Sequence, residues 1–111
     1  MKKVVVITSD IIGKDQEIGQ TLMRLFLNNL AMAVEVPDEI ILMNAGVKLA
    51  CAGSEVLEPL QALAAREVTI SACGTCLDFY DIREQLLIGE GGTMAGTVAA
   101  LMSAQDAVVV S

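Results

Sequence analysis

The chain has 111 residues, the length of one ordinary domain, and 54% of them are hydrophobic whereas only 19% are charged. That balance excludes an intrinsically disordered chain, which needs low hydrophobicity and high charge. The formal net charge is −7, and aromatic residues make up 3% with no tryptophan. Such a surface repels nucleic-acid phosphates and anionic lipid headgroups, and it offers no platform for stacked bases. We therefore expect one domain over residues 1–111, with no nucleic-acid partner and no membrane partner.

The apolar stretches of the sequence are too short for a membrane protein or a secreted one. A helical span needs about 20 mostly apolar residues, and no stretch of that kind is present. The apolar run after the N-terminal lysines stops before Ser9 and Asp10, which is too early for a signal peptide. These features predict a cytoplasmic protein. Because few charges are available to cover a small sphere, we also expect a homo-oligomer that buries the excess apolar surface.

Four short apolar runs rich in valine and isoleucine are predicted to form strands. They are continuous rather than alternating, and polar residues or glycines bound them, which is typical of parallel strands buried on both faces. These predicted strands are residues 4–8, 40–43, 68–70 and 107–110.

The two longer segments between these strands have helical spacing. The first helix is predicted to begin after Asp15, whose side chain can cap it. The second is predicted to begin between Ser54 and Glu58, with Pro59 in its opening turn. The residues that share one mainly apolar face of the first helix are Ile18, Leu22, Leu25, Phe26, Asn29 and Ala33. Those that share a face of the second helix are Val56, Leu60, Leu63 and Ala64.

The region after the third predicted strand is shorter and more broken. Residues 81–84 resemble a capping box that would restart a helix at Asp81, and Ile88 is predicted to form a very short extra strand. Thr93 is expected to cap a last helix. The side chains of that helix expected to face inward are Met94, Val98, Leu101 and Met102. The alternation of strands and helices predicts an α/β fold with three layers, α/β/α, around a mostly parallel sheet.

In open parallel sheets, ligands bind where the carboxyl ends of strands lead into helices. Asp10 follows the first predicted strand and Lys48 follows the second, so both are predicted to be binding residues. The loop of residues 9–14 faintly resembles a phosphate-binding loop, but Asp10 would repel a phosphate, which favours an ordinary turn. For Lys48 the alternative is a solvated lysine without a ligand.

The loop after the third predicted strand carries the most informative pattern, Cys73-Gly74-Thr75-Cys76. Backbone N–H groups and the helix dipole at a strand-to-helix junction favour a thiolate, so Cys73 is predicted to be a nucleophile without help from histidine. Gly74 allows the backbone to approach the sulfur, and the loop N–H groups, that of Thr75 among them, are expected to stabilise the anion. Cys76 lies one helical turn later, within disulfide reach. The alternative is a pair of buried thiols that only pack a helix start.

The odd number of cysteines and the absence of histidine limit other chemistries. A structural disulfide framework is disfavoured in a reducing compartment, and Cys–His and Ser–His nucleophile pairs are excluded. Cys51 is predicted to be a small apolar filler. A zinc site would have to combine Cys51 or Asp78 with the Cys73–Cys76 pair, which is too few ligands, and we expect no metal and no cofactor. A thioredoxin-like motif usually follows an early strand rather than the third one.

Taken together, several segments resemble the DsrE-like domain of YedF-type proteins, which belong to the DsrE/DsrF/TusD sulfur-relay group. The resemblance covers nearly the whole chain. It implies a sheet of about five parallel strands between helix layers (DsrEFH-like), assembly into dimers, trimers or hexamers, and an association with selenium metabolism. It also implies a persulfide carried on the cysteine that follows the third main strand, which is Cys73. The segments that carry the resemblance are residues 4–10, 44–49, 53–57 and 71–80.

The sequence departs from the YedF pattern at several positions. YedF-type chains usually carry a TusA-like domain before the DsrE-like domain, whereas this sequence begins directly at the first strand, so a TusA-like sulfur carrier is expected to act in trans. Cys51 stands where these relatives more often have threonine, and Asp81 stands where glycine is common. Residues 91–94 lack the asparagine usually found there.

From these features we predict a sulfur or selenium relay protein of the sulfurtransferase type. Cys73 takes a sulfur from a donor persulfide and passes it to an acceptor thiol, and Cys76 can instead close a disulfide. Two alternatives stay open at this point. One is a non-catalytic oligomeric interaction module whose cysteines only pack, and the other is a dithiol redox protein.

Overall fold

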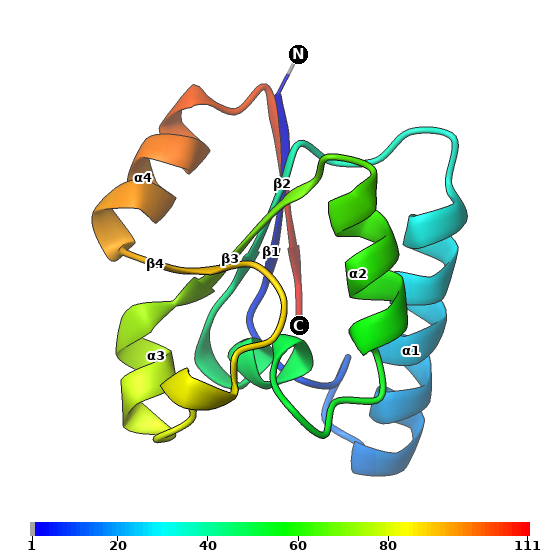
Figure 1. Ribbon diagram of the computed structural model, residues 1–111. Coiled ribbons are helices and arrows are strands. Elements are labelled where there is room, and N and C mark those ends of the chain that lie inside the picture. The colour runs from blue at the N-terminus through cyan, green and yellow to red at the C-terminus, as the bar shows by residue number, and fades with distance from the viewer. Residues whose placement is uncertain (1) are drawn as a thin grey trace.

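The computed structural model describes residues 2–111, which form a five-stranded parallel sheet with helices on both faces (Figure 1). This confirms the predicted three-layer α/β fold. The strands are β1 (Lys3–Ile7), β2 (Glu39–Leu42), β3 (Thr69–Cys73), β4 (Glu90–Gly92) and β5 (Asp106–Val110). The helices are α1 (Gln16–Met32), α2 (Leu57–Ala65), α3 (Gly74–Phe79) and α4 (Met94–Ser103), with 3-10 segments η1 (Asn44–Ala50) and η2 (Arg83–Gln85). No helix of residues 2–111 is long and apolar enough to cross a membrane.

The strand order is β4-β3-β2-β1-β5, and every neighbouring pair is parallel. The chain moves outward from β1 to β4, with α1 and α2 on one face of the sheet, and then returns through α4 on the other face to place β5 beside β1 (Figure 1). Because all five strands run in the same direction, their carboxyl ends meet at one edge. That edge carries η1 and α3, and it is where the predicted site residues lie.

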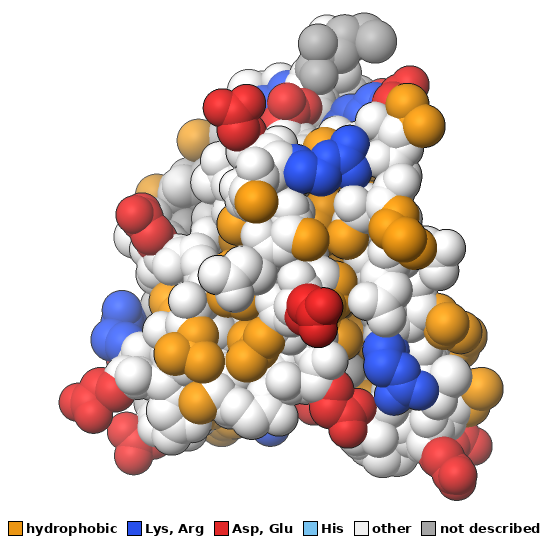
Figure 2. All heavy atoms as spheres, turned by 45° about the vertical axis from the view of Figure 1, so that its right-hand side comes forward, with side chains coloured by type: hydrophobic (Ala, Val, Ile, Leu, Met, Phe, Trp, Pro, Cys, Tyr) orange, Lys and Arg blue, Asp and Glu red, His pale blue; other side chains and the backbone are white. Residues whose placement is uncertain are grey.

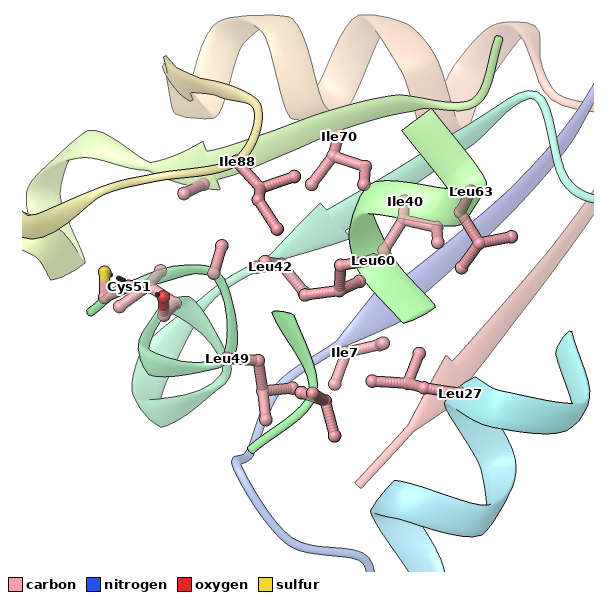
Figure 3. Close-up of a cluster of buried hydrophobic side chains, with 14 of the residues drawn as sticks. Ile7, Leu27, Ile40, Leu42, Leu49, Cys51, Leu60, Leu63, Ile70 and Ile88 are labelled. Carbon is pink, nitrogen blue, oxygen red and sulfur yellow. Dashed lines mark hydrogen bonds between the residues drawn. The ribbon is translucent and has the colours of Figure 1, made fainter. Parts of the chain in front are cut away.

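The core is unequal on the two faces of the sheet. The larger cluster lies between the sheet and the pair α1 and α2, where side chains such as Ile7, Leu27 and Leu60 are fully buried (Figure 3). The smaller cluster lies under α4. Its buried members are Val4, Val6, Ile41 and Ala100. The α4 face therefore depends on few apolar contacts, and it leaves much hydrophobic surface uncovered.

Three helix starts agree with the sequence prediction. The Asp15 side chain accepts a hydrogen bond from the Glu17 N–H at 3.1 Å, which caps α1. The Thr93 hydroxyl oxygen accepts one from the Gly96 N–H at 3.0 Å, which caps α4. Helix α2 begins at Leu57, inside the predicted interval and with its proline in the first turn.

The predicted apolar face of α1 is wrong, because this helix buries a neighbouring stripe instead. Ile18, Leu22 and Leu25 are exposed. A Cβ atom at residue 19 would lie 2.9 Å from the Ile11 Cβ and from the Ile12 carbonyl oxygen, so only glycine lets α1 approach the loop below it. The close approach decides which side of the helix faces the core. The buried residues of α1 are Gly19, Met23 and Leu27.

The inward face predicted for the last helix is wrong for three of its four residues. Met94 and Val98 are exposed, and the Met102 side chain is 80% exposed. Leu101 is partly buried, as predicted, and packs beside the buried Ala100 against the smaller core cluster. The prediction that the last strand is buried on both faces also fails: β5 is an edge strand, and its residues Asp106 to Val109 are exposed.

The extra strand lies two residues later than predicted. β4 spans Glu90–Gly92, and Ile88 is a buried core side chain instead of a strand residue. The shift has a steric cause. Gly89 has a φ of +79°, and a Cβ there would fall 2.2 Å from the Ile70 carbonyl oxygen, so the chain turns at this glycine before it pairs with β3.

The capping box predicted at Asp81 is replaced by a helix C-terminus. Helix α3 ends in a Schellman motif, in which the Ile82 N–H donates to the Leu77 carbonyl at 2.9 Å and the Asp81 N–H donates to the Asp78 carbonyl at 3.1 Å. Asp81 has a φ of 56°, the left-handed conformation that this motif requires. The chain continues as the short 3-10 segment η2 rather than as a restarted α-helix.

Replacing Asp81 by glycine should therefore stabilise the protein by about 0.5–1 kcal/mol, because glycine adopts the left-handed conformation without the steric cost of a Cβ. The free energy of unfolding in urea measures the gain. Glu84→Gly is the matched control, since residue 84 lies in η2 with an ordinary φ, and this variant should lose stability. An equal loss in both variants would contradict the assigned C-cap.

Candidate functional site

The two cysteines of the CxxC motif meet at the carboxyl edge of the sheet. Cys73 is the last residue of β3, and Cys76 lies in the first turn of α3. The Cys73 side chain belongs to the main core cluster and is 8% exposed, whereas Cys76 is half-buried. All three cysteines lie in the described part of the chain, and all are free thiols. Of the pair, Cys76 is therefore the thiol that a second molecule can reach.

A backbone amide from the neighbouring loop reaches the Cys76 sulfur. The Asn44 N–H donates to Cys76 Sγ at 3.1 Å. Asn44 is the first residue of η1, two positions after the end of β2, and its φ of 53° is the left-handed conformation that asparagine adopts more readily than most residues. The pairing of β2 with β3 brings the two loops together, because Leu42 at the end of β2 is opposite Ala72 of β3.

Tyr80 contacts both Asn44, whose amide reaches the Cys76 sulfur, and Lys48. The Tyr80 hydroxyl donates to Asn44 Oδ1 at 3.2 Å, and the Lys48 Nζ lies 4.4 Å from the centroid of the Tyr80 ring. A cation over an aromatic face is attracted by the ring quadrupole. Cys76, Asn44, Tyr80 and Lys48 thus form a continuous chain of contacts along the carboxyl edge of the sheet.

The environment of Cys76 favours the protonated thiol at rest. Burial raises the pKa of Cys76, and the neighbouring Cys73 thiol raises it further, whereas the hydrogen bond from the Asn44 amide lowers it. The sum is a pKa above the ordinary thiol value. The amide therefore offsets part of the cost of forming the Cys76 thiolate but does not remove it.

The expected amide contact at Cys73 is absent from the described residues. The Cys73 side chain makes no capping hydrogen bond to α3, and the backbone N–H that does reach a sulfur comes from η1 and reaches Cys76. Sequence reasoning missed Asn44 and Tyr80 because both act on a residue of another element, and Asn44 is 32 positions away from Cys76. An asparagine directly after a buried strand was the available signal, since this residue type tolerates a positive φ.

Gly74 and Thr75 have surroundings different from those expected of binding residues. A Cβ at Gly74 would lie 2.8 Å from Arg83 Nη2 and 3.1 Å from the Gly92 carbonyl oxygen, so this glycine allows η2 and β4 to pack against α3. Arg83 Nη2 donates to the Gly74 carbonyl at 3.1 Å. The Thr75 side chain is exposed and makes no hydrogen bond to residues 2–111.

Arg83 is a further residue near the cysteines that the sequence did not single out. Its Nε donates to Asp78 Oδ1 at 2.7 Å and its Nη2 to Asp78 Oδ2 at 3.0 Å. The guanidinium lowers the pKa of Asp78, and the carboxylate raises the pKa of Arg83. This bidentate ion pair joins η2 to the exposed side of α3. Each of the two charged groups therefore already has a partner of opposite charge.

Asp10 and Lys48 line one pocket of about 490 Å³ beside the cysteines. Tyr80 also borders this pocket, but neither Cys73 nor Cys76 does. The structure therefore places the predicted residues in two groups, the cysteine pair and the pair of charged residues, with the Tyr80 ring between them.

Cys51 has the buried position expected of an apolar filler. Its side chain is 2% exposed, its thiol donates to the Val47 carbonyl at 3.3 Å, and burial raises its pKa (Figure 3). Across residues 2–111, no three side chains of His, Cys, Asp or Glu come together in a way that could hold a metal ion. The zinc alternative therefore lacks the set of ligands that it would need.

Alkylation of the native protein by iodoacetamide over a pH series should show Cys76 reacting slowly at neutral pH and faster as the pH rises past the ordinary thiol range. In Cys73→Ala the Cys76 profile should shift to lower pH, because both contributions of Cys73 to the raised pKa are removed. Peptide mass spectrometry assigns each modified cysteine. Cys51 should stay unmodified, and Cys51→Ala should leave the Cys76 profile in place. A Cys76 profile that Cys73→Ala leaves unchanged would contradict the assigned coupling.

Comparison with known proteins places this fold in a family. The sequence matches the DsrE/DsrF-like family over residues 1–111, and no curated protein matches it. Among solved structures, the ychN protein from E. coli has a TM-score of 0.72 and 22% identity over 98% of this chain and 99% of that one. The protein MTH1491 of unknown function from Methanobacterium thermoautotrophicum has a TM-score of 0.67 and 19% identity, over 98% and 99%.

A third similar structure is the conserved protein BT1422 of unknown function from Bacteroides thetaiotaomicron, with a TM-score of 0.65 and 16% identity over 98% of this chain and 95% of that one. At these identities the structural similarity supports the fold. The sequence match, which spans the chain from end to end, carries the assignment further: this chain is a member of the DsrE/DsrF-like family.

Proposed function

We propose that the protein is a sulfur-relay protein that carries a persulfide on Cys76, with Cys73 as the second thiol of the site. The observation that carries the proposal is the half-buried Cys76 sulfur, which accepts the Asn44 N–H at 3.1 Å while Cys73 lies in the core. This reverses the order of the two cysteines expected from the resemblance to YedF-type domains. Family membership supports the same chemistry, because the resemblance is to sulfur-relay proteins.

The transfer balances without an external oxidant or reductant. The Cys76 thiolate attacks the outer sulfur of a donor persulfide, the donor S–S bond breaks, and the donor leaves as a thiolate that takes up the proton released by Cys76. An acceptor thiolate then attacks the outer sulfur of the Cys76 persulfide, and Cys76 leaves as the thiolate. A selenium atom in place of the outer sulfur would follow the same steps.

The local groups have distinct roles in this proposal. The Asn44 amide donates to the sulfur and stabilises negative charge on it, as a fixed donor aimed at a developing anion does. Tyr80 holds the Asn44 side chain in place through its hydroxyl. Cys73 can attack the inner sulfur of the Cys76 persulfide, which releases sulfide and closes a Cys73–Cys76 disulfide.

The proposed donor or acceptor is a TusA-like carrier protein that acts in trans in the cytoplasm. The site supports a macromolecular partner because Cys76 lies in a short helix at the open edge of the sheet, with the Phe79 side chain of that helix 82% exposed beside it. An exposed aromatic side chain next to a reactive thiol suits protein docking better than a closed pocket does.

Incubation with a persulfide donor, followed by intact-protein and peptide mass spectrometry, should show a gain of one sulfur on Cys76. Cys76→Ser should lose the gain, and Cys73→Ser should retain it because the core thiol does not accept the sulfur. Cys51→Ala is the matched control and should behave as the wild type. Retention in Cys76→Ser with loss in Cys73→Ser would assign the persulfide to Cys73 instead. If neither the wild type nor any variant gains a sulfur, the result would favour the non-catalytic interaction module instead.

We also propose that the protein assembles with copies of itself through the face that carries α4 and β5. Exposed apolar side chains gather there, and the outer edge of β5 has no neighbouring strand among residues 2–111. Exposed hydrophobic side chains also lie between charged ones on the side that carries α1 and α2 (Figure 2). The exposed apolar residues of the α4–β5 face are Met94, Val98, Met102, Val108 and Val109.

Sedimentation velocity should show the wild type larger than a monomer, and the double variant Val98→Glu, Met102→Glu should sediment as a monomer, since two buried carboxylates without partners disfavour the interface. Val34→Glu is the control, because Val34 is 96% exposed in the turn after α1, and it should leave the assembly intact. A wild type that sediments as a monomer would refute this proposal.

A further inference from the structure

Asp10 and Lys48 line an open pocket that is separate from the two cysteines. Its volume of about 490 Å³ lies within the range of small-molecule sites. It lies at the carboxyl edge of the sheet between α1, η1 and the segment that follows Cys51, and Tyr80 and Gln85 close it on the α3 side. The apolar side chains that line it are Met23, Leu49, Val56 and Ile82.

Two opposite charges in this pocket lack a partner of opposite charge. Within the described chain, the Asp10 carboxylate makes no ion pair and no side-chain hydrogen bond, and Lys48 contacts only the Tyr80 ring as a cation. Glu55 also lines the pocket, but it is paired with Arg24, whose Nη1 lies 3.5 Å from the Glu55 carboxylate oxygen. The cavity therefore presents one available anion and one available cation.

The neutral polar side chains of the pocket are available in the same way. Gln20 on α1 and Gln85 on η2 both line the cavity, and neither amide side chain hydrogen-bonds within residues 2–111. Amides can donate and accept, so they suit a ligand that carries both kinds of group. The apolar side chains below them leave room for a short aliphatic or sulfur-containing part.

We propose that this pocket binds a small zwitterionic thiol, an amino acid or short peptide with a free ammonium and a free carboxylate. The ammonium pairs with Asp10 and the carboxylate with Lys48, while the amides of Gln20 and Gln85 meet the remaining polar groups. The pocket borders Tyr80, whose hydroxyl holds the Asn44 side chain, and the Asn44 amide contacts Cys76. Tyr80 and Asn44 therefore lie between the ligand and the Cys76 sulfur.

Isothermal titration of cysteine and of reduced glutathione into the full chain carrying Cys73→Ser and Cys76→Ser tests binding apart from sulfur transfer. At least one of the two should bind, and which one does identifies an amino acid or a peptide as the ligand. Lys48→Met and Asp10→Asn should each weaken binding about tenfold or more, since each removes a charged partner. Lys14→Met, an exposed lysine outside the pocket, is the matched control and should bind as the parent does.

Ligands that lack one charge test the two contacts separately. N-acetylcysteine has no ammonium, so its weaker binding should not respond to Asp10→Asn. Cysteamine has no carboxylate, so its binding should not respond to Lys48→Met. The assignment would be overturned if neither cysteine nor reduced glutathione bound. It would also be overturned if Lys14→Met weakened the binding of these ligands as much as Lys48→Met does.

The outcomes separate this inference from the proposed function. If a protein persulfide loads Cys76 while neither zwitterion binds, the pocket assignment fails and the relay function stands. If the zwitterions bind as described but no donor loads Cys76, the pocket assignment stands and the relay function fails.

Discussion

The hydrogen bond from the Asn44 amide to the Cys76 sulfur joins the two loops on which the site depends. It exists because β2 and β3 are parallel neighbours, so the residues that follow them emerge side by side at one edge of the sheet. Tyr80 and Lys48 extend the same contact across that edge to the adjoining pocket. Separation of these two strands would remove Asn44 and Lys48 of η1 from Cys76 and Tyr80 together.

Three thiols in one small protein have three different environments, and the environment rather than the residue type assigns their roles. Cys51 donates to a carbonyl within the core, Cys73 closes β3 inside the main cluster, and Cys76 is half-buried beside a donated amide. Burial raises the pKa of Cys76, so its environment favours the protonated thiol. Such a thiol resists indiscriminate oxidation, because the thiolate is the reactive form.

The unequal burial on the two faces of the sheet leaves apolar surface exposed on one of them. Helices α1 and α2 cover one face with large aliphatic side chains, whereas α4 contacts the other face through Ala100 and leaves Met94, Val98 and Met102 exposed. The edge strand β5 adds more exposed valines to the same region. An apolar surface of this kind, on a chain with a net charge of −7, is the basis of the proposed assembly of this protein with copies of itself.

The sequence alone determined the α/β class, the capping residues Asp15 and Thr93 and the position of the CxxC motif, because composition, short-range periodicity and local capping chemistry are all contained in neighbouring residues. It did not determine which stripe of α1 is buried, since that depends on how closely α1 folds back at Gly19 onto Ile11 and Ile12 of the preceding loop. The same limit applies to the cysteines. Spacing located them, but only the folded chain, by bringing Asn44 to Cys76 across 32 positions, distinguished the half-buried sulfur from the core one.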